Sequence, residues 1–154
     1  MTTTSLVLEA PLERIWAVIS TAESYSDWVV GAKNIRHVEG PWPQPGSRFH
    51  HTIGVGPFTL QDDTKSLEAE EPWHLVIEAR GRPLGRARVE FTLTPLAEGT
   101  KVKMDEKIVA PSLMKSLGPL LAPLIRRRND ETLRRLARAV GASAVQEGEA
   151  GGPA

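Results

Sequence analysis

The sequence contains no cysteine, and its 19 basic residues are balanced by 19 acidic ones. Without cysteine, disulfide scaffolds, thiol catalysis and cysteine-ligated metal sites are excluded. The lack of net charge argues against binding of nucleic acid or an anionic membrane through bulk electrostatics. No apolar run approaches the roughly 20 residues of a transmembrane helix, and residues 1–10 do not resemble a signal peptide. We therefore expect a cytoplasmic protein with no nucleic-acid partner and no integral membrane segment.

Motifs for metal, phosphate and nucleophile chemistry are also missing. His50 and His51 are adjacent in an expected strand, so their side chains point to opposite faces and cannot hold one metal ion together. The segment 54–57, Gly-Val-Gly-Pro, lacks the spacing and the lysine of a phosphate-binding loop. No Gly-x-Ser-x-Gly sequence occurs. The sequence thus predicts no metal and no cofactor.

Hydrophobic periodicity predicts α+β secondary structure. A short strand is expected over 3–10, a helix begins at Pro11, and a second brief helix falls within 22–30. The next segments alternate with a period of two and are separated by glycine and proline, without a helix-length gap, so hairpins must join them. The expected strands are 33–39, 47–55, 58–70, 73–80, 84–95 and 99–109.

The last third is predicted to be helical. The amphipathic pattern from about Pro119 to Val140 indicates one long helix that stops at Gly141. Prolines between 111 and 123 predict a short separate helix before it. Residues 141–154 have little bulk and no pattern, so we expect a single domain over 1–140 followed by a flexible tail.

This order of elements predicts a curved antiparallel sheet of six or seven strands wrapped around the long C-terminal helix. The long helix is the element large enough to cover the apolar face of such a sheet. A strongly curved sheet rarely closes completely on one helix, which predicts a cavity between them, with the short helices and the hairpin tips at its mouth.

Several sequence features, in order, resemble the START-like (SRPBCC) superfamily in its polyketide cyclase/dehydrase branch. They cover about residues 3–140 and comprise Ala-Pro-Leu-Glu-Arg-Ile-Trp-Ala-Val-Ile at 10–19, Trp28, Pro45-Gly46, Glu71-Pro72-Trp73, Gly99-Thr100-Lys101-Val102 and the terminal amphipathic helix. The resemblance implies a helix-grip fold around a hydrophobic cavity. Members include aromatase/cyclases, lipid and hormone carriers and stress-response proteins, so the resemblance does not select one function.

Three ionisable residues share the parity of apolar neighbours and are the candidate catalytic residues: His51, Asp62 and Glu106. A hairpin around 54–57 would put His51 and Asp62 on one face, where a carboxylate orienting an imidazole provides a general base. In the alternative, both lie at the cavity rim, solvated or mutually satisfied. The parity of the strand switches before Leu67, so a bulge could also move Asp62 off this face. Glu106 is expected to contact a ligand, water or an arginine of the long helix.

The inner stripe of the long helix contains Asn129, whose amide should hydrogen-bond to a ligand, a trapped water or a strand carbonyl. Its neighbour Arg128 is expected to reach solvent at the cavity edge. Aromatic residues near the expected mouth offer stacking surfaces for a flat ligand. The candidate ligand-binding residues are Trp28, Tyr25, His51, Asp62, Phe91, Met104, Glu106, Leu121, Ile125 and Asn129.

Three functions remain open at this point. The first is binding of a small hydrophobic, lipid-like or aromatic polyketide-like ligand in the cavity. The second is a polyketide cyclase or dehydratase in which His51 is the base, oriented by Asp62, while Glu106 or Asn129 polarises a carbonyl. The third is an interaction module that acts through basic surfaces at 80–88 and 126–138. A monomer and a homodimer are equally compatible with the sequence.

Overall fold

A computed structural model describes residues 1–55, 57–81, 85–110 and 116–146. The helices are α1 (Leu12–Ile19), a 3-10 turn η1 (Ala22–Ser24), α2 (Tyr25–Trp28) and α4 (Gly118–Val140). The strands are β1 (Thr2–Leu8), β2 (Ala32–Lys33), β3 (Val38–Glu39), β4 (Arg48–Val55), β5 (Phe58–Glu70), β6 (His74–Gly81), β7 (Gly85–Leu96), β8 (Gly99–Ala110) and β9 (Ala144–Val145).

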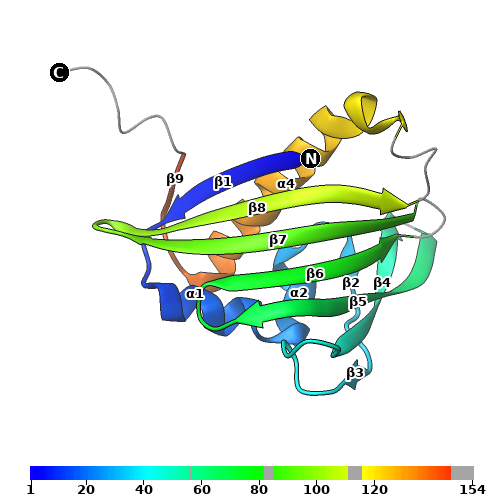
Figure 1. Cartoon of the computed structure of the whole chain (residues 1–154), viewed down its shortest axis with the longest axis horizontal. Helices are drawn as coiled ribbons and strands as arrows, with labels where there is room; N and C mark the ends of the chain where they lie inside the picture. Colours follow the sequence, from blue (N-terminus) through cyan, green and yellow to red (C-terminus); the bar gives the residue numbers. More distant parts are fainter. Residues whose placement is uncertain (56, 82–84, 111–115, 147–154) are drawn as a thin grey trace.

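The described strands form one curled antiparallel sheet. Its order is β2-β4-β5-β6-β7-β8-β1-β9, with β3 added to the edge of β4. The long strands β4 to β8 follow one another as hairpins, and β1 pairs with β8 over its whole length. Figure 1 shows this sheet curving around α4, with α1 and α2 below. The predicted helix-grip architecture is confirmed.

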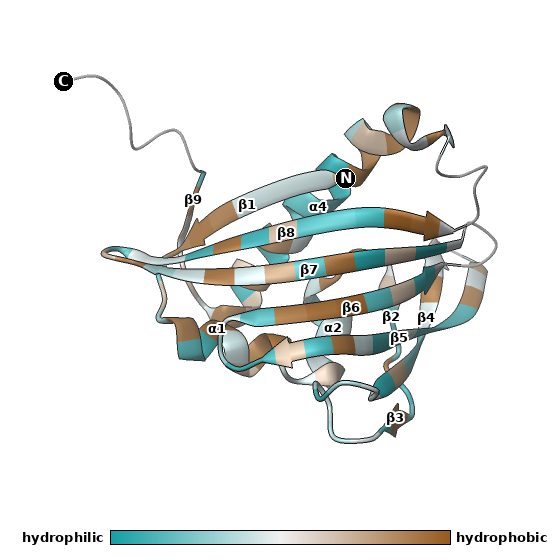
Figure 2. Cartoon of the chain, in the orientation of Figure 1, coloured by the Kyte–Doolittle hydropathy of each residue, from teal (hydrophilic) through white to brown (hydrophobic). Residues whose placement is uncertain are grey.

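Alternating polarity separates the two faces of the sheet. Along β7, Val89, Phe91 and Leu93 are buried, whereas Arg88 is exposed. The same alternation is visible as teal and brown bands along β7 and β8 in Figure 2. An antiparallel sheet with one solvated face requires this pattern.

Within the described residues, no helix is both long and apolar enough to cross a membrane.

The helix α4 covers only part of the concave face of the sheet. Its buried residues begin at Asn129 and continue to Val140, so the second half packs on the core while the first half stands above the sheet. α4 begins at Gly118 and contains Pro123, which confirms the long helix expected from about Pro119; the short helix expected before it falls largely on residues 111–115, which lie outside the described residues. Gly141 ends α4 in the left-handed conformation, with φ of 76°, as predicted.

The two short helices position an aromatic core beneath the sheet. Tyr25 and Trp28 on α2 lie with ring centroids 4.7 Å apart, and Tyr25 also contacts Phe49 on β4 at 4.8 Å. Trp28 contacts Phe91 on β7 at 5.8 Å. Edge-to-face and tilted ring pairs of this kind stabilise a core beyond the burial of area.

Two details of the sheet differ from the sequence-based expectation. Residues 33–39 form two short strands, β2 and β3, which both pair with β4, because Asn34 has a positive φ of 47° that interrupts the extended chain. Ala144–Val145 form β9 against Val7 and Leu8, within the segment expected to be a flexible tail; residues 147–154 lie outside the described residues. The bulge expected near Leu67 in β5 is confirmed and lies between Ser66 and Glu68.

Candidate functional site

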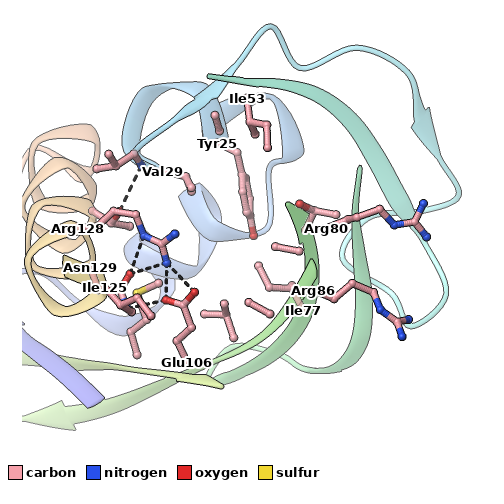
Figure 3. Close-up of a pocket in the computed structure, with 18 of the residues that line it drawn as sticks. Tyr25, Val29, Ile53, Ile77, Arg80, Arg86, Glu106, Ile125, Arg128 and Asn129 are labelled. Atoms are coloured by element: carbon pink, nitrogen blue, oxygen red, sulfur yellow. Dashed lines mark hydrogen bonds and ion pairs between the residues drawn. The ribbon is translucent and has the colours of Figure 1, made fainter. Parts of the chain in front are cut away.

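A cavity of about 390 Å³ lies between α4, α2 and the concave face of the sheet. Ile125 and Arg128 in the first half of α4 form part of one side of it (Figure 3). Its volume falls in the range of small-molecule sites. Its walls are predominantly apolar and include Val29, Val30, Ala32, Phe49, Ile53, Ile77, Ala79, Ala87, Val89, Phe91, Met104, Ile108, Leu121, Leu124 and Ile125.

A polar cluster of three residues interrupts this apolar wall. Glu106 on β8 is only 5% exposed, and Asn129 on α4 is fully buried. The Glu106 carboxylate accepts a hydrogen bond from Arg128 Nη2 at 2.6 Å and one from Asn129 Nδ2 at 2.8 Å. Asn129 Oδ1 in turn accepts hydrogen bonds from Arg128 Nε and Nη2 at 3.3 and 3.2 Å. Figure 3 shows the cluster at one side of the cavity.

The contacts in this cluster can be compared with what the sequence predicted for its three residues. The alternation of β8 correctly places Glu106 inward, and its contact with an arginine of the long helix is confirmed. The Asn129 amide donates a hydrogen bond to the Glu106 carboxylate. The sequence had predicted a ligand, a water or a strand carbonyl as its partner. Arg128 lines the cavity and reaches solvent as expected, with its side chain 44% exposed, and it also forms an ion pair with Glu106. The buried carboxylate of Glu106 supplies the attraction that draws it in.

His51 on β4 faces the cavity as a largely neutral imidazole. Burial lowers the pKa of His51 below its ordinary value, and this effect outweighs the raising effect of the nearby Asp62 and Asp63 charges. Its Nε2 lies 2.9 Å from the Thr64 hydroxyl, and its buried Nδ1 has no hydrogen-bond partner among the described residues. A neutral imidazole with an unused nitrogen at a cavity wall has the protonation state that a general base needs.

Asp62 lies directly opposite His51 in the ladder between β4 and β5. The bulge in β5 comes after this pair, so the expected pairing register is confirmed. Asp62 is buried, and its Oδ1 accepts a hydrogen bond from the Asp63 backbone at 3.0 Å. The residues that line the cavity include His51 and Thr64 but not Asp62.

The predicted aromatic contacts divide into two groups. Tyr25 lines the cavity, and its ring is directed toward the cavity in Figure 3. Its buried hydroxyl has no hydrogen-bond partner in the part of the chain that the structure describes, and burial raises the pKa of Tyr25. Trp28 is fully buried in the core, donates to Ser24 Oγ at 3.0 Å, and is not part of the lining. The structure therefore brings together eight of the ten candidate residues, leaving out Trp28 and Asp62: Tyr25, His51, Phe91, Met104, Glu106, Leu121, Ile125 and Asn129.

Sequence reasoning did not select several polar groups in the wall. Thr64 and Thr132 line the cavity, and Thr132 Oγ1 accepts a hydrogen bond from the Val30 backbone at 3.2 Å. Threonine alternation is common in strands, so nothing in the sequence distinguishes Thr64 from its neighbours. Thr132 does share the inner stripe of α4 with Leu133 and Leu136, and that position could have identified it.

The surface arginines are largely engaged with acidic residues. Arg80 and Arg86 are among the residues that line the cavity, but Figure 3 shows both guanidinium groups directed away from it. Arg80 pairs with Asp63 at 3.5 Å, and Arg86 pairs with Glu78 at 3.3 Å. Arg134, Arg135 and Arg138 all lie within 4.0 Å of Glu131. Such pairs describe an ordinary solvated surface and weaken the case for a basic interaction module.

The described residues offer no grouping of three or more histidine, aspartate or glutamate side chains that could hold a metal ion. The site combines an apolar cavity, a histidine whose pKa is lowered by burial, and a charged pair that is hydrogen-bonded to an amide.

The curled sheet, the gripped helix and the cavity define a protein of the START-like class. The chain belongs to the family described as "Polyketide cyclase / dehydrase and lipid transport", whose model matches residues 2–141. No match was found among curated proteins. The resemblance stated from the sequence is thus confirmed.

Solved structures show the same fold at low sequence identity. Protein MLL2253 from Mesorhizobium loti is similar with a TM-score of 0.67 and 19% identity, over 91% of this chain and 96% of that one. Protein NE0264 from Nitrosomonas europaea is similar with a TM-score of 0.70 and 16% identity, over 90% and 92% of the two chains. DynU16, encoded in the dynemicin biosynthetic locus, is similar with a TM-score of 0.64 and 19% identity, over 91% of this chain and 46% of that one.

Proposed function

We propose that the protein binds a small hydrophobic molecule, lipid-like or aromatic polyketide-like, in the cavity beneath α4. The observation that carries the proposal is the cavity of about 390 Å³ with predominantly apolar walls and a few convergent polar groups. Unfilled apolar space loses dispersion contacts and does not attract water, so a guest of matching shape gains both burial and packing. The family description, which includes lipid transport, supports ligand binding as the general role.

Substituting a small residue of the cavity wall by a large one tests this function. N-phenyl-1-naphthylamine is an uncharged apolar dye whose fluorescence rises when it leaves water. Ala79 lines the cavity, whereas Ala139 lies on the exposed face of α4. Ala79→Trp is expected to lower dye affinity at least about tenfold because the indole occupies the ligand space, and Ala139→Trp is expected to bind like the unmodified protein. Equal dye binding by Ala79→Trp would place the binding surface elsewhere.

A second function, proton abstraction from the bound molecule, is favoured by the state of His51. Burial lowers the pKa of His51, which favours the neutral imidazole, and its Nδ1 has no hydrogen-bond partner among the residues that the structure describes. A base of this kind exchanges the protons beside a carbonyl. Deuterium uptake into the methyl group of 2-acetylnaphthalene, followed by NMR in heavy water, should be accelerated by the protein and lost in His51→Gln. If uptake is equal with and without protein, the site binds without this chemistry.

A further inference from the structure

The Arg128 guanidinium uses only part of its donor set inside the polar cluster. Its Nε and Nη2 atoms donate to Asn129 and Glu106. No hydrogen-bond partner for Nη1 occurs among the residues that the structure describes. Figure 3 shows this remaining nitrogen on the side of the guanidinium that faces the cavity. Two N–H donors are therefore offered to whatever occupies the apolar space.

The position of these donors is fixed before any ligand arrives. Glu106 and Asn129 are buried, and both accept hydrogen bonds from the guanidinium. A planar guanidinium held in this way keeps its free edge in one orientation, which an ammonium group on a flexible chain cannot do. Donors that are already oriented lose little freedom when a ligand binds, so more of their hydrogen-bond energy appears as affinity.

The charge of the cluster determines which oxygen fits. The Glu106 carboxylate neutralises Arg128, and Glu106 is only 5% exposed. A ligand carboxylate at Nη1 would share the same guanidinium with Glu106 and would bring a second negative charge into an apolar cavity. Like charges in such a site disfavour each other, and burying an unbalanced charge is strongly unfavourable. An uncharged carbonyl oxygen accepts the same hydrogen bonds without that penalty.

We propose that Arg128 anchors an uncharged carbonyl oxygen of the ligand through Nη1, and that Glu106 makes the cavity reject carboxylates of the same shape. This assignment rests on the proposed binding function and specifies the chemical class of its ligand. The apolar remainder of the ligand lies against the wall formed by Ile125, Met104 and their neighbours.

Three rigid probes of similar shape test the assignment: 2-acetylnaphthalene, 2-ethylnaphthalene and 2-naphthoate. Each is titrated against protein carrying N-phenyl-1-naphthylamine, and displacement gives its affinity. The ketone is expected to bind about tenfold more tightly than the hydrocarbon, the size of one hydrogen bond from a charged group, and the carboxylate is expected to bind weakest. Equal binding of ketone and hydrocarbon, or tighter binding of the carboxylate, overturns the anchor while dye binding keeps the cavity function. Failure of the dye itself contradicts the proposed function.

Two variants isolate the charged pair, and each is checked for folding by circular dichroism. Arg128→Lys keeps the charge but loses the free planar edge, so the advantage of the ketone over the hydrocarbon should disappear. Arg127→Lys is the matched control, because Arg127 is an exposed neighbour outside the lining. Glu106→Gln removes the rejecting charge, so 2-naphthoate should bind at least about fivefold more tightly than to the unmodified protein. Unchanged 2-naphthoate affinity in Glu106→Gln contradicts the role of Glu106.

Discussion

Glu106 on β8 and Arg128 on α4 form an ion pair across one wall of the cavity, with Arg128 Nη2 2.6 Å from Glu106 Oε1. The pair ties the sheet to the helix at the point where α4 begins to be buried. Asn129 completes the tie by donating to the same carboxylate. Buried charges of this kind are tolerated when each is paired and hydrogen-bonded, and here the pair forms part of a ligand cavity.

Removing the carboxylate should destabilise the fold. Glu106→Ala leaves the buried Asn129 amide and the inner edge of Arg128 without their acceptor. We expect the free energy of unfolding in a urea titration to fall by about 2 kcal/mol. Glu98→Ala, at an exposed position in the turn before β8, should stay within about 0.5 kcal/mol of the unmodified protein. Equal stability of the two variants would show that the cluster has no structural role.

Replacing one amide nitrogen by oxygen should make stability depend on pH in a defined direction. Asn129→Asp places a carboxylate where Nδ2 now donates to Glu106. In the folded variant the two carboxylates hold a shared proton more strongly than in the unfolded chain, so the folded state binds more protons and stability falls as pH rises. Relative to the unmodified protein at the same pH, the urea midpoint of Asn129→Asp should therefore be lower at pH 8 than at pH 5. Asn34→Asp, at an exposed position, should show no such added dependence.

The buried Tyr25 hydroxyl should oppose folding of the empty protein. It has no hydrogen-bond partner within the described ranges of the chain, and an unsatisfied buried donor costs about 1–3 kcal/mol. Tyr25→Phe keeps the ring contacts with Phe49 and Trp28 while removing the hydroxyl. Its melting temperature should equal or exceed that of the unmodified protein. Trp28→Phe, which breaks the hydrogen bond to Ser24 and leaves a void, should melt earlier; a large loss in Tyr25→Phe would mean that the hydroxyl has a partner.

His51 should contribute an acid-sensitive part of the stability. Burial lowers the pKa of His51 below its ordinary 6.5, so near this pH the unfolded chain binds more protons than the folded one. The free energy of unfolding therefore falls as pH drops below about 6.5. His51→Gln should flatten this decline between pH 7.5 and 5. His37→Gln, whose side chain is 71% exposed, should leave the decline intact, and an unchanged slope in His51→Gln would contradict the burial effect.

Periodicity predicted the elements that bear the site because the relevant signals are local. Alternation along β8 placed Glu106 inward, and the stripe on α4 did the same for Asn129. Their contact joins residues 23 positions apart in sequence, and it depends on how α4 crosses the sheet. No local pattern encodes that crossing, so the ion pair with Arg128 could be anticipated only as contact with an unspecified arginine.

Trp28 and β9 show where local patterns fail. A tryptophan after a short helix has the same sequence appearance whether it faces a cavity or the core, and packing against Phe91 at 5.8 Å decides the question. The strand β9 spans only Ala144–Val145, which is too short to show a period of two. Its position is determined by the edge that β1 offers after α4 ends, a consequence of the tertiary fold.

Native mass spectrometry of the protein purified from its own host tests the central claim most directly. We expect the protein to carry a small molecule that dissociates on denaturation, and the Ala79→Trp variant, prepared in parallel, to carry much less of it. The mass of that molecule identifies the ligand class. If the purified protein shows only its own mass and also fails to bind N-phenyl-1-naphthylamine, the cavity is not a ligand site and the central claim is contradicted.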